Sequence, residues 1–580
     1  MTVARYLAAT GDPQRLRDWL GALVPPLDSS QRLNRAFDAP DLVAYASPEA
    51  KLLLLAEGRG LVIGRLYRGA ESSERVDRVT LSESRHAAWS RGRSLLEGFW
   101  GGFVAFLRDE NAVTVLRDPC GTVPAYYCEA AGLQVYFSSV EMLRDLSLDR
   151  APIDEEFLRQ WVTYPSLRTA RTGLSGRFEL LPGTARSSSS GAASVSTMWS
   201  PWRAAEAERR VLDFDEAARR VREVTLATVP VQVEGLESPV LELSGGLDSS
   251  IVAACLRQAG VPFRAANFVT RTADGDERDY ARLVASALDL ELAELPEEAA
   301  ELDLSPPATP TLRPPLSPVL QPLHSALSRH AREAGSADFV TGAGGDNVFC
   351  YLTTTAPVLD AAADSGLRAA LATVRDVATL GDCTVWKAAG FALRKRLRGK
   401  RPPWRRDERF LAARAIAPEP DPHPWLDRPE DAQPGTIEHV ESLVLIQHFL
   451  EPEYGSGEAL HHPLINQPLI ELCLAIPTWL WLRGGRNRAV ARAAFADLLP
   501  ARIVRRRTKG RLESMCARAY AENRERLTDL LLGGELARRG LLDRSCLEHY
   551  LRATGSPRDD AYFRVFDLVS LELWLRSWSR

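Results

Sequence analysis

The segment from residue 238 to residue 260, SPVLELSGGLDSSIVAACLRQAG, constrains the fold of this chain more than any other part of its sequence. Its apolar run VLEL (240–243) has the composition of a buried strand, and IVAACLRQAG (251–260) continues as a helix. The residues between them are small or polar and include two adjacent glycines. Because a further apolar run, VPFRAANFV (261–269), follows at once, the order strand, helix, strand predicts a parallel sheet with crossover helices.

Residues 244–250 between that strand and that helix, SGGLDSS, favour binding of a phosphate chain. Gly245 and Gly246 allow a tight turn and a close approach of the backbone to a ligand. The start of the helix offers unpaired N–H groups and the positive end of its dipole to an anion. Asp248 would repel phosphate unless a cation stood between them, so we interpret it as a ligand of Mg²⁺. The serine hydroxyls add donors at Ser244, Ser249 and Ser250. The segment therefore predicts a pyrophosphate-binding loop, and it lacks the GxxxxGK[ST] pattern.

Two further segments could complete such a site. The glycine-rich run TGAGGDN (341–347) follows the short apolar stretch DFV (338–340), and open α/β sheets bind ligands beyond the carboxyl ends of their strands. Asp346 would then supply a second carboxylate to the metal. The basic run RRRTKG (505–510) contains Lys509, which would neutralise developing charge beside the pyrophosphate. Taken alone, the first run is as consistent with a plain turn, and the second with a basic surface turn.

The pattern of apolar residues in the sequence changes near residue 205. Before it, short apolar runs alternate with turn signals, which is a β-rich pattern. These runs are LVAYA (42–46), KLLLLAEG (51–58), GLVIGRLYRG (60–69), GFVAFLRD (102–109), AVTVLRD (112–118) and LQVYFSS (133–139). Helical periodicity begins at DFDEAARRVREVTLATV (213–229). The serine-rich stretch ARSSSSGAASVSTMW (185–199) is interpreted as a flexible surface connection. We therefore expect one domain over residues 1–205 and another over 206–580.

Composition narrows the classes of protein. With 72 Lys and Arg against 76 Asp and Glu, the net charge of −4 does not indicate a nucleic-acid-coating protein. The N-terminus has no signal-peptide core, and no apolar run of about 18 residues predicts a membrane span. The eight cysteines are scattered without metal-binding spacing, which is typical of buried free thiols in a reducing compartment. We expect a cytoplasmic protein without nucleic-acid or membrane partners.

One local charge run stands out, RKRLRGKRPPWRRDER (394–409), which carries nine lysines and arginines. Pro402 and Pro403 prevent it from forming one continuous helix. It is interpreted as a solvated helix end and loop, with a docking surface for an acidic peptide or another polyanion as the alternative. The wider region 351–435 is a candidate lid or partner surface.

Taken in their order along the chain, these elements resemble the synthetase domain of the asparagine synthetase family. SGGLDSS resembles the PP-loop of ATP pyrophosphatases, which cleave ATP to AMP and pyrophosphate and adenylate a carboxylate or carbonyl oxygen. GAGGD (342–346) occupies the place of the second loop, and HPLINQPLIELCLAIP (462–477) precedes the basic turn R-x-K-G (507–510) as in that family. The region 351–435 matches it weakly.

The N-terminal half resembles the same family's glutamine amidotransferase domain of the N-terminal-nucleophile fold. RDPCGTVPAYY (117–127) and FSSVE (137–141) carry this resemblance. The implied fold is a degenerate glutaminase-like β-rich domain, followed by a PP-loop ATP-pyrophosphatase α/β domain with a parallel sheet and a helical C-terminal part.

Two departures imply that the glutaminase is lost. Residue 2 is Thr2, where a glutaminase of this family needs a cysteine exposed after methionine removal. The family's Asn-Gly-Glu segment is replaced by Ile63-Gly64-Arg65, which removes the amide and reverses the charge. The domain would then act as a scaffold, and the amine that attacks the acyl adenylate would be one already carried by the substrate.

Family branches of this kind include β-lactam-type synthetases and lasso-peptide macrocyclases. The β-lactam branch has a tyrosine where this chain has Ala343, whereas GGDNVF (344–349) and HHPL (461–464) look more like the lasso cyclases. The resemblance thus implies a cyclase that adenylates an Asp or Glu side chain of a precursor peptide and closes the ring with the N-terminal amine. A leader peptidase or leader-recognition protein would be its partner. The alternatives are another amide ligase acting on a small molecule, including an ammonia-dependent asparagine synthetase, and a non-catalytic binding protein.

The resemblance also assigns roles to residues of this chain. ATP and Mg²⁺ are the implied cofactors, with Asp248 and Asp346 as metal ligands. Lys509 and Glu451 are the catalytic candidates, and Glu441 is a weaker one that is as readily a helix-surface carboxylate. His461 and His462 are expected to be structural or to line the substrate site, because adjacent residues of an extended stretch point in opposite directions. The residues expected to bind the nucleotide are Leu243, Ser244, Gly245, Gly246, Leu247, Asp248, Ser249, Ser250, Phe268, Thr341, Gly342, Gly344 and Gly345.

Overall fold

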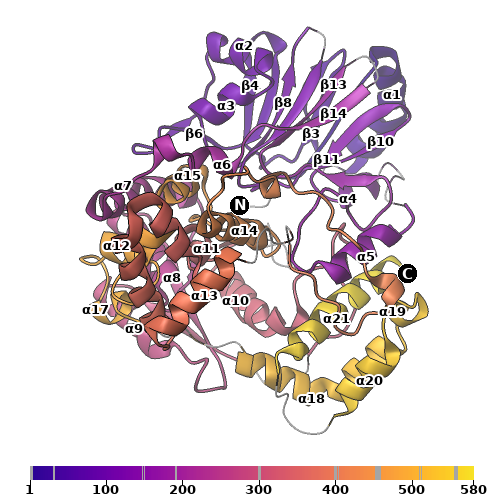
Figure 1. Cartoon of the computed structure of the whole chain (residues 1–580). Coiled ribbons are helices and arrows are strands. Elements are labelled where there is room, and N and C mark those ends of the chain that lie inside the picture. The colour runs from indigo at the N-terminus through magenta and orange to yellow at the C-terminus, as the bar shows by residue number, and fades with distance from the viewer. Residues whose placement is uncertain are drawn as a thin grey trace.

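A computed structural model describes most of the 580-residue chain (Figure 1). The described residues are 4–30, 33–110, 112–144, 146, 148, 150–189, 192–297, 302–397, 402, 404–450, 459–507, 510, 513–553 and 559–579. None of the helices that the structure describes is long and apolar enough to cross a membrane. All eight cysteines are free thiols, and five of them are buried, as expected from their scatter.

The N-terminal part is a sandwich of two antiparallel sheets, which form the indigo to magenta region of Figure 1. One sheet has the order β12-β10-β11-β1-β3-β2, and the other β14-β13-β9-β8-β5-β4. Apolar side chains of both sheets, among them Tyr6, Leu61 and Phe106, form the core between them. Helix α1 (Pro13–Ser30) covers the outer face of the first sheet, and α2 (Leu81–Trp89) and α3 (Arg93–Gly98) cover the second. This layering confirms that the N-terminal domain is β-rich, as predicted.

The predicted apolar runs fall on β3, β4, β5, β8, β9 and β11 of the sandwich, and its other strands were not predicted. The strands of the sandwich are β1 (Tyr6–Thr10), β2 (Asn34–Ala39), β3 (Leu42–Ala46), β4 (Leu52–Leu55), β5 (Gly60–Gly64), β8 (Phe103–Arg108), β9 (Val113–Arg117), β10 (Tyr126–Ala130), β11 (Leu133–Phe137), β12 (Arg177–Glu179), β13 (Thr184–Ser189) and β14 (Ala192–Thr197). A small ribbon of β6 (Leu66–Arg68) and β7 (Glu74–Val76) lies beside them.

The serine-rich stretch is part of this sandwich, so its interpretation as a flexible connection is wrong. Strands β13 and β14 pair antiparallel, and β13 also pairs with β9. The hydroxyls of Thr114 and Ser187 form a hydrogen bond of 2.8 Å across the β9–β13 pair. Small hydroxyl side chains suit a strand that must pack on only one face, and backbone pairing with an existing sheet outweighs the low strand preference of serine.

The C-terminal part contains a five-stranded sheet of order β17-β16-β15-β18-β19, in which every pair is parallel. Its strands are β15 (Val240–Glu242), β16 (Arg264–Val269), β17 (Leu292–Pro296), β18 (Asp338–Val340) and β19 (Ala459–His461). The chain adds β16 and β17 on one side of β15 and then β18 and β19 on the other. The strand order therefore reverses between β15 and β18, which is where open α/β sheets bind ligands. The parallel sheet that the sequence predicts is confirmed.

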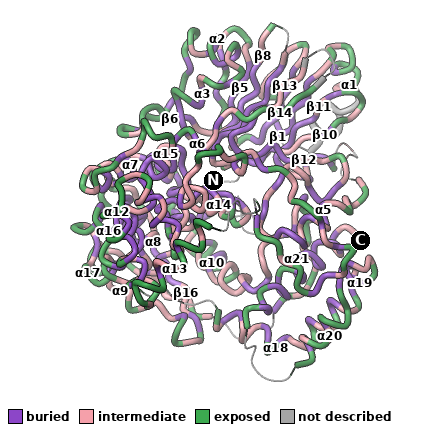
Figure 2. The backbone as a smooth tube through the Cα atoms, in the orientation of Figure 1, coloured by how far each residue is buried: buried purple, intermediate pink, exposed green. Residues whose placement is uncertain are grey.

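Helices surround this sheet and form the C-terminal end of the chain. They are α7 (Phe214–Val233), α8 (Leu247–Gln258), α9 (Arg278–Ala287), α10 (Gln321–Glu333), α11 (Gly345–Val348), α12 (Ala356–Leu380), α13 (Val385–Leu397), α14 (Pro434–Gln447), α15 (Gln467–Ala475), α16 (Ala489–Ala494), α17 (Ala501–Val504), α18 (Glu513–Leu532), α19 (Glu535–Arg538), α20 (Arg544–Arg552) and α21 (Ala561–Trp578), and short helices α4 (Glu141–Arg144), α5 (Glu155–Thr163) and α6 (Pro201–Ala204) precede them. Figure 2 shows that α21 is largely buried although it lies at the end of the chain.

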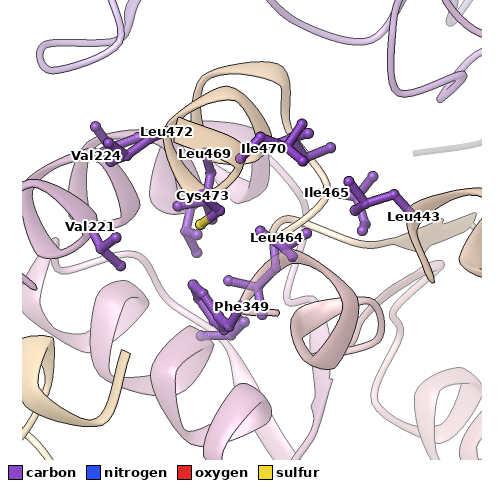
Figure 3. Close-up of a cluster of buried hydrophobic side chains, with 14 of the residues drawn as sticks. Val221, Val224, Phe349, Leu443, Leu464, Ile465, Leu469, Ile470, Leu472 and Cys473 are labelled. Atoms are coloured by element: carbon purple, nitrogen blue, oxygen red, sulfur yellow. The ribbon is translucent and has the colours of Figure 1, made fainter. Parts of the chain in front are cut away.

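The hydrophobic core passes from one part of the chain into the other. Val62 and Leu107 of the sandwich belong to the same buried cluster as Ile251 and Leu469. Figure 3 shows its C-terminal portion, where Phe349 and Cys473 face Val221 of α7. Because the core is continuous, a domain boundary at residue 205 stays a prediction.

The basic run is only partly solvated. Helix α13 ends at Leu397, and Lys395 forms an ion pair with Glu438. Trp404 is buried and donates from Nε1 to the carbonyl oxygen of Pro165 at 3.0 Å. The run therefore includes anchoring contacts as well as exposed charges, and the effect of Pro402 and Pro403 on the helix stays a prediction.

Candidate active site

The loop 244–250, named the PP-loop from here on, joins β15 to α8 in a conformation that requires its first glycine. Gly245 has φ +70°, and a Cβ there would lie 2.4 Å from the carbonyl carbon of Tyr280. Gly246 begins helix α8 without a side-chain cap, so the first N–H groups of the helix face the loop. The hydroxyls of Ser244 and Ser249 lie 3.1 Å apart, and Ser250 donates to the carbonyl of Gly246 at 2.6 Å. These contacts pre-shape an anion cradle of the predicted kind.

The second loop, residues 341–347, lies directly against the PP-loop. A Cβ on Gly342 would come within 2.5 Å of the amide nitrogen of Ser249, and one on Gly345 within 2.5 Å of the Asp248 carboxyl carbon. Within the loop, Ala343 donates its N–H to the Thr341 hydroxyl at 2.8 Å. The structure thus brings together the two glycine-rich loops that the sequence analysis paired, at the point where the strand order reverses.

Gly342→Ala tests this close contact. The added methyl group must push the second loop away from the start of α8, because backbone on both sides leaves it no space. We expect a loss of about 1–3 kcal/mol in the free energy of unfolding, as overpacking typically costs, and weaker nucleotide binding. Gly98→Ala is the matched control, since its Cβ would meet nothing within 4 Å. Chemical denaturation and nucleotide titration measure both effects, and equal behaviour of the two variants would contradict the contact.

Arg488 joins the two loops electrostatically. Its Nη1 lies 2.9 Å from Asp248 Oδ1 and 2.5 Å from Asp346 Oδ1, and its side chain is only 9% exposed. Its Nε is buried without a hydrogen-bond partner among the described residues. The backbone of Arg488 is left-handed, with φ 52° and ψ 33°, which is uncommon for a residue other than glycine.

Sequence analysis missed Arg488. It lies in the arginine-rich stretch RGGRNRAVARAA (483–494), where no local pattern separates it from the other arginines. Its role follows only from the contact with Asp248, which is 240 positions away in the chain.

The two carboxylates suit a magnesium ion that arrives with phosphate. Asp248 and Asp346 share one guanidinium nitrogen, so their oxygens lie close together. Mg²⁺ prefers hard oxygen ligands and is typically held by one or two carboxylates plus substrate phosphates. Within the described part of the chain, no group of three or more His, Cys, Asp and Glu residues could hold a metal by itself. The donor set therefore fits Mg²⁺ bound together with ATP, and that assignment remains a prediction.

The basic turn is anchored beside the PP-loop by Glu277. Arg506 donates to the Glu277 carboxylate at 2.6 Å and to the carbonyl of Gly245 at 3.2 Å. The N–H of Gly510 donates to the same Glu277 oxygen at 2.9 Å. The guanidinium of Arg506 also stacks 3.7 Å from the ring centroid of Tyr280. The flanks of the turn thus lie where the predicted charge neutralisation needs them.

Both predicted catalytic residues, Lys509 and Glu451, lie outside the described residues, so their roles stay predictions. Glu441 lies on α14. Of the adenosine candidates, Leu243 is fully buried and its carbonyl accepts a hydrogen bond from the Asn267 amide at 2.9 Å. Phe268 follows on β16 and is partly exposed.

His439 of α14 contacts the backbone at the end of the second loop. Its Nε2 lies 2.9 Å from the carbonyl oxygen of Asn347 and 3.2 Å from that of Val348, so Nε2 carries a hydrogen and is the donor. Burial lowers the pKa of His439 to about 4, although those carbonyls oppose the shift. A neutral imidazole is therefore built into the fold.

The free energy of unfolding should fall at acid pH because His439 is held neutral in the fold. A pKa lowered on folding means that the unfolded chain takes up a proton first, so stability present above pH 6.5 is lost as the pH falls towards 4. We expect the stability advantage of the wild type over His439→Gln to shrink by about 2 kcal/mol between pH 7 and pH 5. Denaturant unfolding at both pH values measures it. A pH-independent difference would mean that His439 is not held neutral.

The segment from Ile63 to Tyr67 forms part of the contact between the two halves of the chain. Arg65, which replaces the expected glutamate, donates to the carbonyl of Gln232 on α7 at 3.2 Å. The hydroxyl of Tyr67 donates to the carbonyl of Val231 at 2.9 Å. Ile63 is fully buried, and Thr2 lies outside the described residues. The segment thus holds the sandwich to the second half, as a scaffold would.

A cavity of about 1390 Å³ extends from this region to the second loop. Its lining includes Arg65, Cys120 and Thr122 from the sandwich, and Thr341 and Ala343 from the second loop. His461 and His462 line it as well, which agrees with the substrate-lining role expected of them. The ring of His461 is held by Asp338, with Nε2 and Oδ1 2.8 Å apart.

Comparisons with known proteins agree with this geometry. The family model described as asparagine synthase matches residues 220–576. A carboxyethyl-arginine β-lactam synthase of Streptomyces clavuligerus is 31% identical over 161 residues, which are 27% of this chain and 28% of that protein. The matched stretch thus spans little more than a quarter of that relative's length.

Among solved structures, two proteins match at 11% identity. The allosteric regulatory enzyme of purine biosynthesis aligns over 53% of this chain and 82% of its own, with a TM-score of 0.21. The glutamine phosphoribosylpyrophosphate amidotransferase of B. subtilis, complexed with ADP and GMP, aligns over 53% and 83%, with a TM-score of 0.20.

Proposed function

This chain belongs to the asparagine synthase family, and from that premise we propose that it is an ATP-dependent ligase that forms an amide bond and releases AMP and pyrophosphate. The intact PP-loop, the second loop packed on it and the arginine between them support adenylation of a carboxylate. More specifically, we propose a lasso-peptide cyclase. It would adenylate an Asp or Glu side chain of a precursor peptide and close an isopeptide ring with the peptide's own N-terminal amine.

The single observation that supports this proposal is the contact of Arg65 with the second half of the chain. Arg65 holds α7 where the family's glutaminase needs an acidic residue. We therefore propose that glutamine supplies no ammonia and that the attacking amine is one carried by the substrate. An amine and a carboxylate on one molecule give ring closure, and holding the two groups in attack geometry is the main catalytic task.

The chain's own residues divide the remaining work. The N–H groups at the start of α8 and the Ser244 and Ser249 hydroxyls would bind the departing pyrophosphate. Bound Mg²⁺, held by Asp248 and Asp346, would offset phosphate charge during adenylation. Arg488 and Arg506 would add buried positive charge on either side, and Lys509 would stabilise charge that develops at the reacting carbon. Glu451 is the candidate group for accepting the amine proton.

A second candidate function rests on the β-lactam synthase similarity. Under it, the chain would close a ring on a small molecule rather than on a peptide. Ala343 lies on the cavity side of the second loop, at the position where the β-lactam branch has its tyrosine. A methyl group cannot assist proton transfer, which favours the peptide cyclase. Ammonia-dependent asparagine synthesis is a further alternative of the small-molecule kind.

Mass spectrometry tests the proposal directly. A candidate precursor peptide, chosen from short reading frames beside this gene, is incubated with the protein, a leader peptidase and Mg²⁺-ATP. We expect the leaderless peptide to lose one water while an equal amount of AMP forms. AMP without a mass change would mean that the adenylation is right and the acceptor wrong. Neither change, with a peptidase shown to be active, or the absence of such a peptide, would favour the small-molecule ligase.

A further inference from the structure

The cavity between the two halves of the chain is larger than an amino-acid-sized substrate needs. Its volume of about 1390 Å³ exceeds the range of roughly 300–1000 Å³ that is typical of pockets for small molecules. It is one continuous space from the second loop to the former glutaminase region. A substrate that reacts at Ala343 and extends towards Thr122 would therefore be oligomeric in size.

The described lining of this cavity is electropositive. It contains eight arginine and lysine side chains against four glutamates and aspartates. An anionic or carboxylate-bearing ligand suits such a wall, because the desolvated space strengthens each charge interaction.

Positive charge is concentrated around one buried carboxylate, Glu179. Arg117, Arg168 and Arg313 lie 2.7, 3.0 and 2.8 Å from its oxygens, and Glu179 itself is 0% exposed. All three arginines line the cavity. Burial alone would raise the pKa of Glu179, but these three guanidiniums outweigh it and hold that pKa well below its usual range. One carboxylate thus forms ion pairs with three cations.

Arg313 is the member of this cluster that keeps one nitrogen without a hydrogen-bond partner among the described residues. Its Nε binds Glu179, and its Nη2 donates to the carbonyls of Thr169 and Arg171. No described residue accepts a hydrogen bond from its Nη1. Burial, and then the positive charges of Arg168 and Arg313, lower the pKa of the nearby His448 to about 3.

Building on the proposed cyclase function, we propose that this cavity holds the tail of the substrate peptide, with its C-terminal carboxylate paired to Arg313. Every leader-free peptide has that carboxylate, whatever its sequence, so the site gives the enzyme a fixed point on a variable substrate. The tail would lie in the cavity while the side chain to be activated and the N-terminal amine meet at the second loop. The former glutaminase half would thus have become the half that binds the tail.

Calorimetric titration without ATP tests the carboxylate contact. The probes are the leaderless candidate peptide and the same peptide with an amidated C-terminus. We expect the wild type to bind the acid about tenfold to a hundredfold more tightly than the amide, which is the range for a hydrogen bond to a charged group. Arg313→Gln should remove this preference. The affinity of Arg313→Gln for the amide should stay near the wild-type value, which shows that the variant is folded.

A second variant tests the volume. Thr122 is exposed into the cavity, and Thr122→Trp should fill part of it and weaken binding of both peptides at least tenfold. The matched control is Thr197→Trp, an exposed position on β14 that does not line the cavity. Nucleotide binding should be unchanged in both variants.

The outcomes separate this inference from the function on which it rests. If the wild type cyclises the peptide but binds acid and amide equally, or if Thr122→Trp behaves like Thr197→Trp, the tail site is wrong and the cyclase stands. Loss of the acid preference in Arg313→Gln together with weaker binding of the amide would assign Arg313 a structural role. If the wild type neither binds nor converts the peptide, the proposed function and the tail site fail together.

Discussion

Asp248→Ala is expected to reduce pyrophosphate release from ATP at least about 100-fold, because a metal ligand and its charge are lost from the phosphate site. The carboxylate lies against Gly345 of the second loop and shares Arg488 with Asp346. With Asp248 removed, only the carboxylate of Asp346 remains for the metal, and Arg488 stays paired with it. A coupled assay of pyrophosphate formation, at saturating ATP and Mg²⁺ with the substrate peptide, gives the rate.

The matched control for this prediction is Asp77→Ala, an exposed aspartate of the sandwich whose side chain is 77% exposed. It should release pyrophosphate at the wild-type rate. Thermal unfolding of both variants shows whether the fold is intact. Full activity of a folded Asp248→Ala protein would remove the metal assignment, whichever amide-forming reaction the enzyme performs.

The largest expected effect on stability comes from Arg488→Gln. This change removes a buried cation from between Asp248 and Asp346 and leaves two carboxylates facing each other. Removing one partner of a buried ion pair costs about 3–5 kcal/mol, so the free energy of unfolding should fall by that amount. Magnesium should then stabilise the variant without nucleotide, since the ion can take the place of the guanidinium. The wild type should show no such stabilisation, because Arg488 already occupies that position.

A double variant provides the control. In Arg488→Gln combined with Asp346→Asn, one of the two opposed charges is gone, and part of the lost stability should return. The effect of Mg²⁺ alone should also weaken, because the ion would have one carboxylate fewer. Denaturant unfolding with and without Mg²⁺ measures the wild type, the single variants Arg488→Gln and Asp346→Asn, and the double variant. Purely additive losses would show that Arg488 acts by packing and not by bridging the two carboxylates.

The strand, loop and helix around the PP-loop could be predicted from the sequence because each reports a local preference. The alternation of apolar runs with glycine and serine turns fixes φ/ψ over a few residues, and the structure confirms β15 and α8 within that segment. The second loop could be paired with the first only through the general rule about strand ends, and the packing of Gly342 on Ser249 agrees with it.

Local patterns failed where backbone pairing was not local. The serine-rich stretch has the composition of a linker, yet it forms β13 because β9 offers a free edge with which it can pair. Strand pairing satisfies backbone hydrogen bonds that the side chains themselves do not encode. The serine-rich composition of this stretch therefore led to a wrong prediction of its structure.

The sequence by itself determined the phosphate-binding chemistry, since Ser244 to Ser250 carry it in seven consecutive residues. Only the tertiary structure shows that Arg488 forms an ion pair with Asp248 at this site and that Arg65 donates a hydrogen bond to α7. It also shows that residues of both halves line one charged cavity. The physical reason is distance along the chain. A contact between side chains hundreds of positions apart depends on how whole sheets and helices pack, and no local periodicity reports that packing.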